Sequence, residues 1–217
     1  MGVVNAVIAV LSMGMVLTAS MISDERRVDR AAKLYSVQSI LLSLVFVTLG
    51  VTGPRYFLVW AASAMVTKAV LVPLFLLRLT KHTRAREDKP VLGGSLTWIA
   101  DGLSVTVGFI IALKTAPPHL LAPMTTAISL FLIGLVQIML RRNLGKQVLG
   151  LCHFENSSHL TLALMAPNIP ETVEIGMGTD AVLLVFFGCL VASRIHGLFK
   201  TLDSTALVEL REEVDAE

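Results

Sequence analysis

The sequence predicts an all-α membrane protein: a polytopic membrane helix bundle of about seven transmembrane helices, with the N-terminus outside and the C-terminus cytoplasmic. Composition is the first reason, because 54% of the 217 residues are hydrophobic, only 16% are charged, and the mean hydropathy is +0.75. A soluble domain needs more polar surface than this chain offers. The second reason is a series of apolar segments of spanning length, and the third is the confinement of basic residues to alternate loops.

Composition also excludes several classes of function. A helix that crosses about 30 Å of hydrocarbon needs roughly 20 apolar residues, so this length leaves no room for a self-contained nucleotide-binding or redox domain. The net charge of +2 is too small to favour nucleic acid as a partner. Cys152 and Cys189 lie in apolar runs and are interpreted as packing residues rather than as part of a disulfide or metal framework.

Seven apolar segments are predicted to cross the membrane, at about 3–22, 34–52, 56–79, 91–113, 120–140, 147–166 and 172–194. The first is interpreted as a retained helix rather than a secretory signal, because no basic residue precedes its apolar run. Gly53-Pro54 separates the second segment from the third, Pro117-Pro118 the fourth from the fifth, and a Pro-Asn-Ile-Pro turn the sixth from the seventh. All are apolar on every side, whereas barrel strands alternate, so helices are expected.

The basic residues indicate how the chain is oriented. Fifteen of them fall in loops or tail on one side: Arg26, Arg27, Arg30, Lys33, Arg78, Lys81, Arg84, Arg86, Lys89, Arg141, Arg142, Lys146, Arg194, Lys200 and Arg211. Arg55 and Lys114 fall on the other side, and Lys68 lies inside a segment. This split predicts that the first group faces the cytoplasm, which places the N-terminus outside and the C-terminus inside.

The sequence contains one internal match. Residues 65–71 align with residues 177–183 at an offset of 112, and six of the eleven positions from 65 to 75 are identical. The offset predicts that the first three segments are a parallel repeat of the last three. The expected division is 1–80 for the first repeat, 81–119 for a connector with the fourth helix, 120–200 for the second repeat, and 201–217 for a cytoplasmic tail.

Five ionisable residues lie inside the apolar segments: Lys68, Asp101, Glu155, His159 and Asp180. Each charged group at the bilayer centre costs at least about 2.5–3.5 kcal/mol, so pairing, water or proton binding has to compensate them. The rise of a helix puts Lys68 about 18 Å and Asp180 about 12 Å from the outer ends of their segments, and the two other carboxylates at similar depth. Titratable groups at one level are what a lateral proton path needs.

The spacing suggests a role for each of these groups. Glu155 and His159 are four residues apart and share one helix face, where a proton can pass between them through one water. Pro73 follows Lys68 by five residues and cannot donate a backbone hydrogen bond, which predicts a kink beside the ammonium. Such a kink would hold water at the lysine or act as a hinge when its charge changes. The alternative is that Lys68 forms a fixed ion pair with Asp101. Glu174 is either an acid at the outer access to the path or a solvated helix-start residue.

Several stretches of the chain resemble membrane component E of hydrogenase-4, from the group-4 membrane-bound NiFe hydrogenases and formate hydrogenlyase-type complexes. These stretches are residues 154–160, 173–176, 179–181, 60–64 and 68–73. The last three segments are also similar to the K subunit of bacterial complex I and the C subunit of multisubunit sodium/proton antiporters. Those subunits carry two functional carboxylates on consecutive helices; Asp180 matches the second, and Cys152 stands at the first, with Glu155 one turn away.

The resemblance implies a membrane subunit with no catalytic site and no cofactor of its own, while NiFe and iron–sulfur centres lie in partner subunits. Antiporter-like membrane subunits, a peripheral hydrogenase or dehydrogenase arm, and lipid are the expected partners. Glu155, Asp180 and Lys68 are the expected relay for protons or sodium, with His159 and Asp101 as modulators. The alternative function is a structural spacer whose buried charges are static pairs. An independent transporter is disfavoured because no pair of broken helices is present.

Overall fold

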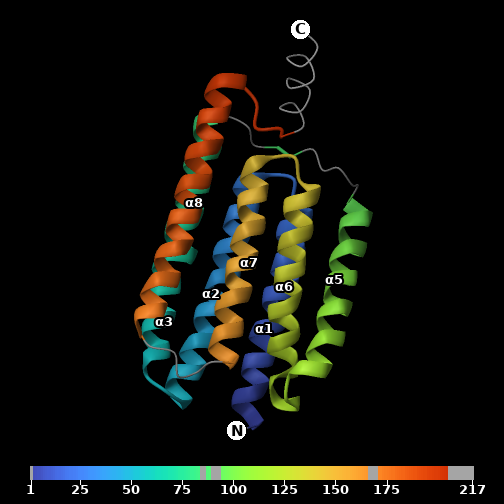
Figure 1. Cartoon of the computed structure of the whole chain (residues 1–217), viewed down its shortest axis with the longest axis vertical. Helices are drawn as coiled ribbons and strands as arrows, with labels where there is room; N and C mark the ends of the chain where they lie inside the picture. The colour runs from blue at the N-terminus through green and yellow to red at the C-terminus, as the bar shows by residue number, and fades with distance from the viewer. Residues whose placement is uncertain (1, 84–86, 89–93, 166–170, 205–217) are drawn as a thin grey trace.

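The computed structural model describes residues 2–83, 87–88, 94–165 and 171–204, except for the side chains of 171–178. Its helices are α1 (Gly2–Asp24), α2 (Val28–Thr52), α3 (Tyr56–Ala64), η1 (Met65–Leu71), α4 (Val72–Thr83), α5 (Gly94–Thr115), η2 (Pro118–Leu120), α6 (Leu121–Leu140), α7 (Leu144–Met165) and α8 (Glu171–Phe199). Because α3, η1 and α4 run on as one rod, the described residues form seven long rods (Figure 1), which confirms the predicted all-α bundle and shows a helix at each of the seven predicted segments.

Six of the seven rods are long and apolar enough to cross a membrane by length and hydropathy, and α7 falls short on hydropathy. The shortfall follows from the sequence of α7, which carries lysine, histidine, glutamate, asparagine and serine along its length. Most of these side chains are buried inside the bundle rather than exposed to lipid. The least apolar helix is therefore the one that lines the polar interior.

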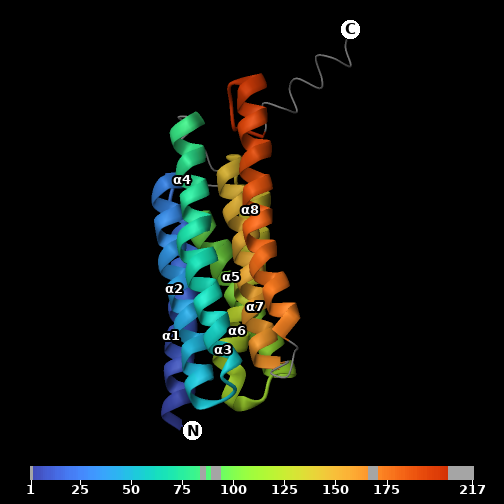
Figure 2. The same ribbon diagram turned by 90° about the vertical axis from the view of Figure 1, so that its left-hand side faces the viewer.

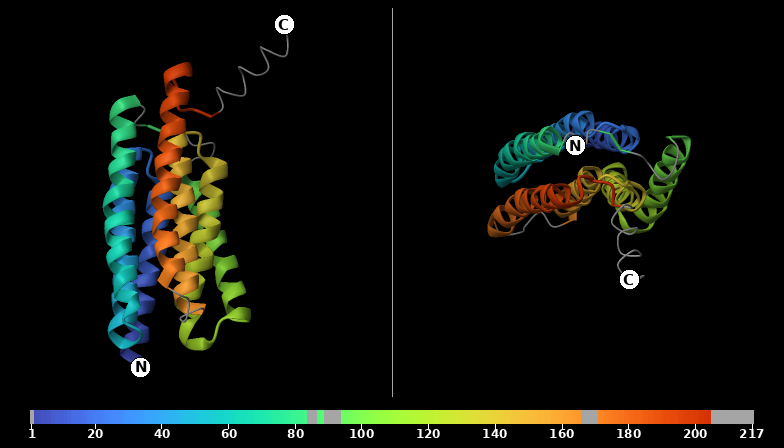
Figure 3. Two further views of the ribbon diagram at one scale, coloured as in Figure 1. Left: turned by 60° about the vertical axis from the view of Figure 1, so that its left-hand side comes forward. Right: turned by 90° about the horizontal axis from the view of Figure 1, so that it is seen from above.

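The rods form two rows. Seen along the bundle axis, α1, α2 and the α3–α4 rod make one row and α6, α7 and α8 make the other, with α5 at the edge (Figure 3). Helix α1 packs on α6, α2 packs on α7, and α4 and η1 pack on α8, while α5 packs mainly on α6. The two rows face each other as a duplication of three helices would require, but the repeat itself and its boundaries stay a prediction.

Glycines allow the closest helix contacts. A Cβ atom on Gly134 of α6 would lie 2.6 Å from the carbonyl oxygen of Gly150 on α7, and a Cβ atom on Gly150 would lie 2.8 Å from that of Gly134. Small residues that let two backbones approach are a usual basis for helix packing in lipid. This contact fixes α7 against α6 and thereby sets which face of α7 meets the opposite row.

One end of the bundle is closed by linked loops, and we call it the basic end: α1, α4, α6 and α8 finish there and α2, α5 and α7 begin there (Figure 2). Short bridges join Arg27 to Glu87 and Asn143 to Asp203. The Lys146 ammonium, buried in this end, donates to the carbonyls of Ile22 and Glu25, the latter at 2.8 Å, and so caps α1. The side of the membrane that this end faces stays a prediction.

Candidate functional site

Lys68 lies on η1, where the third rod changes from an α-helix to a π-helix. The backbone N–H of Val72 bonds to the carbonyl of Thr67, five residues back, and Pro73 follows without an N–H. The disturbance that Pro73 predicts thus takes the form of a seven-residue π-helix centred on the lysine. Short π-helical stretches are frequent at functional sites because they widen the helix and redirect its side chains.

The Lys68 ammonium is completely buried and contacts three side chains of α7 in the opposite row. Nζ lies 3.3 Å from Oε1 of Glu155, 3.0 Å from Oδ1 of Asn156 and 2.8 Å from Nδ1 of His159. The contacts with Asn156 and His159 are hydrogen bonds, and the contact with Glu155 is an ion pair. Neither carboxylate oxygen of Glu155 has a hydrogen-bond partner among the described residues, so the ion pair with Lys68 compensates its charge.

The alternative interpretation, a fixed ion pair between Lys68 and Asp101, is wrong. Asp101 is on α5, which stands at the edge of the bundle against α6 and α1, whereas η1 packs against α2 and α8. Helix rise predicts the depth of a residue but not the side of the bundle on which its helix lies. Glu155, at similar depth on α7, is the actual partner.

His159 offers one nitrogen to two partners of opposite kind. Its Nδ1 lies 2.8 Å from the Lys68 ammonium, which is a donor, and 3.0 Å from the backbone carbonyl of Glu155, which is an acceptor. When Nδ1 accepts from a charged Lys68 it has no proton for the carbonyl, and when it carries a proton it donates to that carbonyl. The imidazole therefore has two alternative hydrogen-bond arrangements, selected by where the proton is. The predicted shared face of Glu155 and His159 is confirmed, with Oε1 and Nδ1 3.9 Å apart.

A chain of neutral groups continues from Asn156 into the first row. The Gln38 side-chain amide donates to the Met15 carbonyl at 3.0 Å, which orients its oxygen toward α7. That oxygen accepts from Nδ2 of Asn156 at 3.2 Å and from Nδ1 of His153 at 3.0 Å. Since the Gln38 oxygen can only accept, Nδ1 of His153 carries the proton. Nε2 of the neutral ring is then a buried acceptor, without a partner among the described residues.

The sequence analysis missed Asn156 and His153 as members of the site. Gln38, which contacts α1 and two residues of α7, is also part of this polar chain. The signal was available, because His153, Asn156 and His159 recur every three residues along α7 and all are buried. Such a polar stripe in a membrane helix indicates an interior path or a polar interface.

Asp180 lies beside this cluster but on the perimeter of the bundle. It is exposed on α8, and it is close enough to Glu155 to interact with it electrostatically. Lys68, Glu155, His159 and Asp180 are therefore brought into one region by η1, α7 and α8. The side chain of Glu174 lies outside the described residues.

Asp101 occupies a separate place nearer the basic end. Its side chain is 1% exposed, and neither carboxylate oxygen has a hydrogen-bond partner among the described residues. Its electrostatic neighbours include Ser23 of α1 and the Arg141 guanidinium. Arg141 itself pairs with Asp88 at 3.2 Å. Among the residues that the structure describes, no three His, Cys, Asp or Glu side chains come together as a metal site requires.

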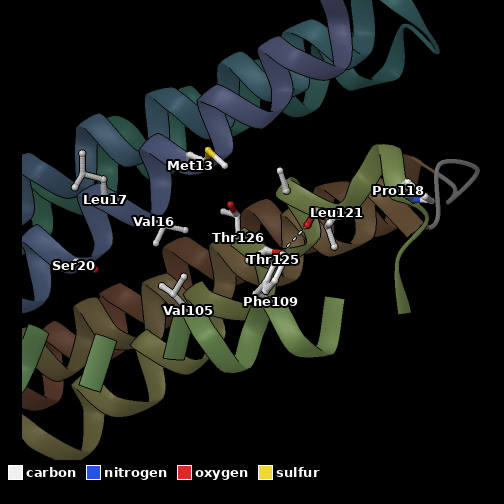
Figure 4. A pocket seen from close by; sticks show the side chains of 11 residues that line it. Met13, Val16, Leu17, Ser20, Val105, Phe109, Pro118, Leu121, Thr125 and Thr126 are labelled. Atoms are coloured by element: carbon white, nitrogen blue, oxygen red, sulfur yellow. Dashed lines mark hydrogen bonds between the residues drawn. The ribbon is translucent and has the colours of Figure 1, made fainter. Parts of the chain in front are cut away.

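A cavity of about 570 Å³ lies between α1, α5 and α6 and is separate from the charged cluster (Figure 4). Its walls are mainly apolar and include Met13, Val16, Leu17, Val105, Phe109 and Leu121. The hydroxyl of Thr125 is used within its own helix, where it donates to the Leu121 carbonyl at 2.8 Å. The cavity therefore offers an apolar surface and no part of the relay.

Comparison with known proteins gives three kinds of match. The family model described as NADH-ubiquinone/plastoquinone oxidoreductase chain 4L matches residues 122–212. Hydrogenase-4 component E of Escherichia coli strain K12 and that of Shigella flexneri are each 33% identical over 202 residues, which cover 91% of this chain and 94% of theirs. An uncharacterized protein of Mycobacterium tuberculosis is 23% identical over 205 residues, 92% of this chain and 93% of its own. No solved structure matches.

Proposed function

The chain belongs to the hydrogenase-4 component E family, and from this membership we propose that it supplies a proton or sodium relay near the middle of the membrane. It is a multi-pass membrane subunit of a respiratory-type complex, as its family and its match to oxidoreductase chain 4L indicate. The proposal assigns redox chemistry, with its NiFe and iron–sulfur centres, to other subunits in a prokaryotic inner membrane. The partners would be antiporter-like membrane subunits and a peripheral hydrogenase or dehydrogenase arm.

The observation that carries the relay is the contact between Lys68, Glu155 and His159. Two titratable groups, the Glu155 carboxylate and the His159 imidazole, lie within 3.3 Å of the buried ammonium nitrogen of Lys68. A lone charge in hydrocarbon costs at least about 2.5–3.5 kcal/mol, so the pair is stable only while both partners keep compatible charges. A change of protonation at one group therefore forces a change at another.

The geometry gives an order to the proton steps. A proton that reaches the Glu155 carboxylate neutralises it, and the Lys68 ammonium loses its counter-charge. Lys68 then passes a proton from Nζ to Nδ1 of His159, so that the N–H bond on Nζ breaks as the one on Nδ1 forms, 2.8 Å away. The protonated ring turns its hydrogen bond to the Glu155 carbonyl and then releases the proton. The proton on the Glu155 carboxyl passes to the neutral Lys68 amine 3.3 Å away, so that the O–H bond breaks as the N–H bond on Nζ forms again, and this restores the ion pair of the first state.

Asp180 extends the path to the edge of the subunit. Its carboxylate is exposed on a helix that is apolar enough to cross the membrane. Lipid cannot compensate this charge, so we expect a neighbouring antiporter-like subunit to cover this face of α8 with a cationic or hydrated group. Glu155 and Asp180 then connect the interior of this chain with the next subunit.

The second candidate function is a structural spacer, and one observation favours it. The Lys68 ammonium already has two hydrogen bonds and an ion pair within the chain, and the Asn156–Gln38 chain holds the two rows together as a static network would. A spacer needs the network only for assembly. A relay needs its groups to exchange protons.

The test is made in membrane vesicles that contain the assembled complex. Glu155→Gln and Asp180→Asn should leave assembly and the peripheral redox rate measurable with a soluble acceptor, but abolish the ion gradient coupled to turnover. Glu87→Gln changes an exposed carboxylate of the basic end and serves as the control, which should pump normally. Normal gradients in both site variants, with the complex assembled, would reject the relay and favour the spacer.

A further inference from the structure

A groove runs between α4 and α8 up to the basic end. It consists of two adjoining cavities of about 540 and 430 Å³ that share His82, Leu190 and Ser193 as lining residues. The two helices are packed against each other along this stretch and rise together to the basic end (Figure 2). The rings of Phe75 and Phe186, with centroids 5.9 Å apart, join the two walls in its lower part.

The apolar and basic residues of the groove lie at different depths. Measured by helix rise from the outer ends of their rods, Phe75 and Phe186 are about 28 and 22 Å deep, within a hydrocarbon layer of about 30 Å. Arg78 and Arg194 are about 33 and 34 Å deep on the same scale, at the level where phosphate groups begin. The groove therefore passes from acyl-chain depth to headgroup depth between these two pairs.

The upper part of the groove is positively charged. Arg78 of α4 and Arg194 of α8 line it from opposite sides, and both are exposed. No acidic residue is among its described lining, and neither arginine makes a salt bridge within the described part of the chain. His82 and the hydroxyl of Ser193 add hydrogen-bonding groups at the same place.

We propose that this groove binds one anionic phospholipid, with its phosphate between Arg78 and Arg194 and an acyl chain along Phe75, Phe186 and Leu190. Paired basic side chains between membrane helices at a membrane face select lipids with anionic headgroups. The apolar lower wall distinguishes such a lipid from a free phosphate, which has nothing to place there. The bound lipid fills the space between two helices that carry the relay groups Lys68 and Asp180 deeper in the membrane.

Native mass spectrometry of the full chain in detergent tests this proposal, with phosphatidylglycerol and phosphatidylcholine of identical acyl chains as probes. The wild type should bind phosphatidylglycerol more tightly. Arg78→Gln with Arg194→Gln should weaken phosphatidylglycerol about thirty-fold, since each cation near the membrane surface contributes roughly a factor of five, and should leave phosphatidylcholine unchanged. Arg78→Lys with Arg194→Lys should keep the preference, which separates loss of charge from misfolding.

The matched control is Arg26→Gln with Arg30→Gln, two exposed arginines of the same end that do not line the groove. This control should bind phosphatidylglycerol as the wild type does, and an equal loss in it would overturn the proposal. Glycerol phosphate, which has the headgroup without acyl chains, should not displace the lipid at equal concentration. Displacement would show a site for soluble phosphate compounds instead, and equal binding of the two lipids by the wild type would show no headgroup site at all.

Discussion

Removing the charges of Lys68 and Glu155 together should destabilise the chain by clearly less than the sum of the two single removals. Lys68→Met leaves the Glu155 carboxylate buried without its counter-charge, and removal of one partner of a buried pair costs about 3–5 kcal/mol. Glu155→Gln should cost less, about 1–3 kcal/mol, because Lys68 keeps its contacts with Asn156 and His159. The double variant has no unpaired charge at this pair, so its cost should fall below the sum of the two by at least about 2 kcal/mol.

The assay is unfolding of the purified chain in mixed micelles with increasing dodecyl sulfate, which yields a free energy of unfolding for each variant and a coupling energy for the pair. A second cycle, of Lys68→Met with Asp101→Asn, is the comparison, because Asp101 lies on α5 with other neighbours. That second cycle should be additive within about 0.5 kcal/mol. Additivity in the first cycle, or strong coupling in the second, would refute the geometry of the site.

Three further predictions concern packing and burial. Gly150→Ala should lower the free energy of unfolding by about 1–3 kcal/mol, because its Cβ would lie 2.8 Å from a backbone oxygen of α6. Gly102→Ala, whose Cβ would meet nothing within 4 Å, should be nearly neutral in the same micelle unfolding assay. Lys146→Met should lower the free energy of unfolding by about 1–3 kcal/mol, because the carbonyls at the end of α1 lose their hydrogen-bond donor. Lys33→Met, at an exposed site, is the control, and an unchanged free energy for Lys146→Met would contradict the contact. Cys152, which is completely buried, should resist maleimide in micelles and react after denaturation, and rapid labelling of the folded chain would contradict its placement.

The sequence predicts the helices well because lipid leaves a spanning chain few alternatives. Any segment that crosses hydrocarbon has to satisfy its backbone internally, so an apolar run of about 20 residues between polar turns indicates a helix. Several helices of the structure are longer than the predicted segments by a few residues, as in α8, which runs from Glu171 to Phe199 while the prediction ends at 194. The difference arises where a helix continues past the hydrocarbon into polar sequence, which hydropathy does not detect.

For the site, the sequence predicts how deep Lys68 and Glu155 lie in the membrane, but not which residues contact each other. Lys68 and Glu155 lie near one level and Asp101 lies nearer the basic end, but which of these groups contact each other depends on how the rods are arranged around the bundle axis. That arrangement depends on contacts such as the one between Gly134 and Gly150, whose effect is not visible in a hydropathy pattern. The alternative of a Lys68–Asp101 pair was therefore wrong, whereas the roles of the charged residues stay a prediction.

Polar uncharged residues were harder to interpret. Asn156 lies between Lys68 and Gln38, and its amide orientation is settled only because both partners are seen at once. In sequence, an asparagine or glutamine in a membrane helix is equally compatible with joining two helices and with lining a path, because both roles need the same hydrogen-bonding groups. Spatial continuity between successive partners is what distinguishes the two roles.

Lys68 and Asp180 align at the same position of the internal match, yet their surroundings in the structure are opposite. Lys68 is completely buried and compensated within the chain, whereas Asp180 is exposed on α8. An exposed carboxylate at this depth costs at least about 2.5–3.5 kcal/mol in lipid, and folding of this chain does nothing to remove that cost. A neighbouring subunit that covers α8 removes it. Because binding of a neighbouring subunit would remove this cost, the exposed charge of Asp180 favours assembly. The proposed relay would then leave this chain on the face of α8 where that subunit binds.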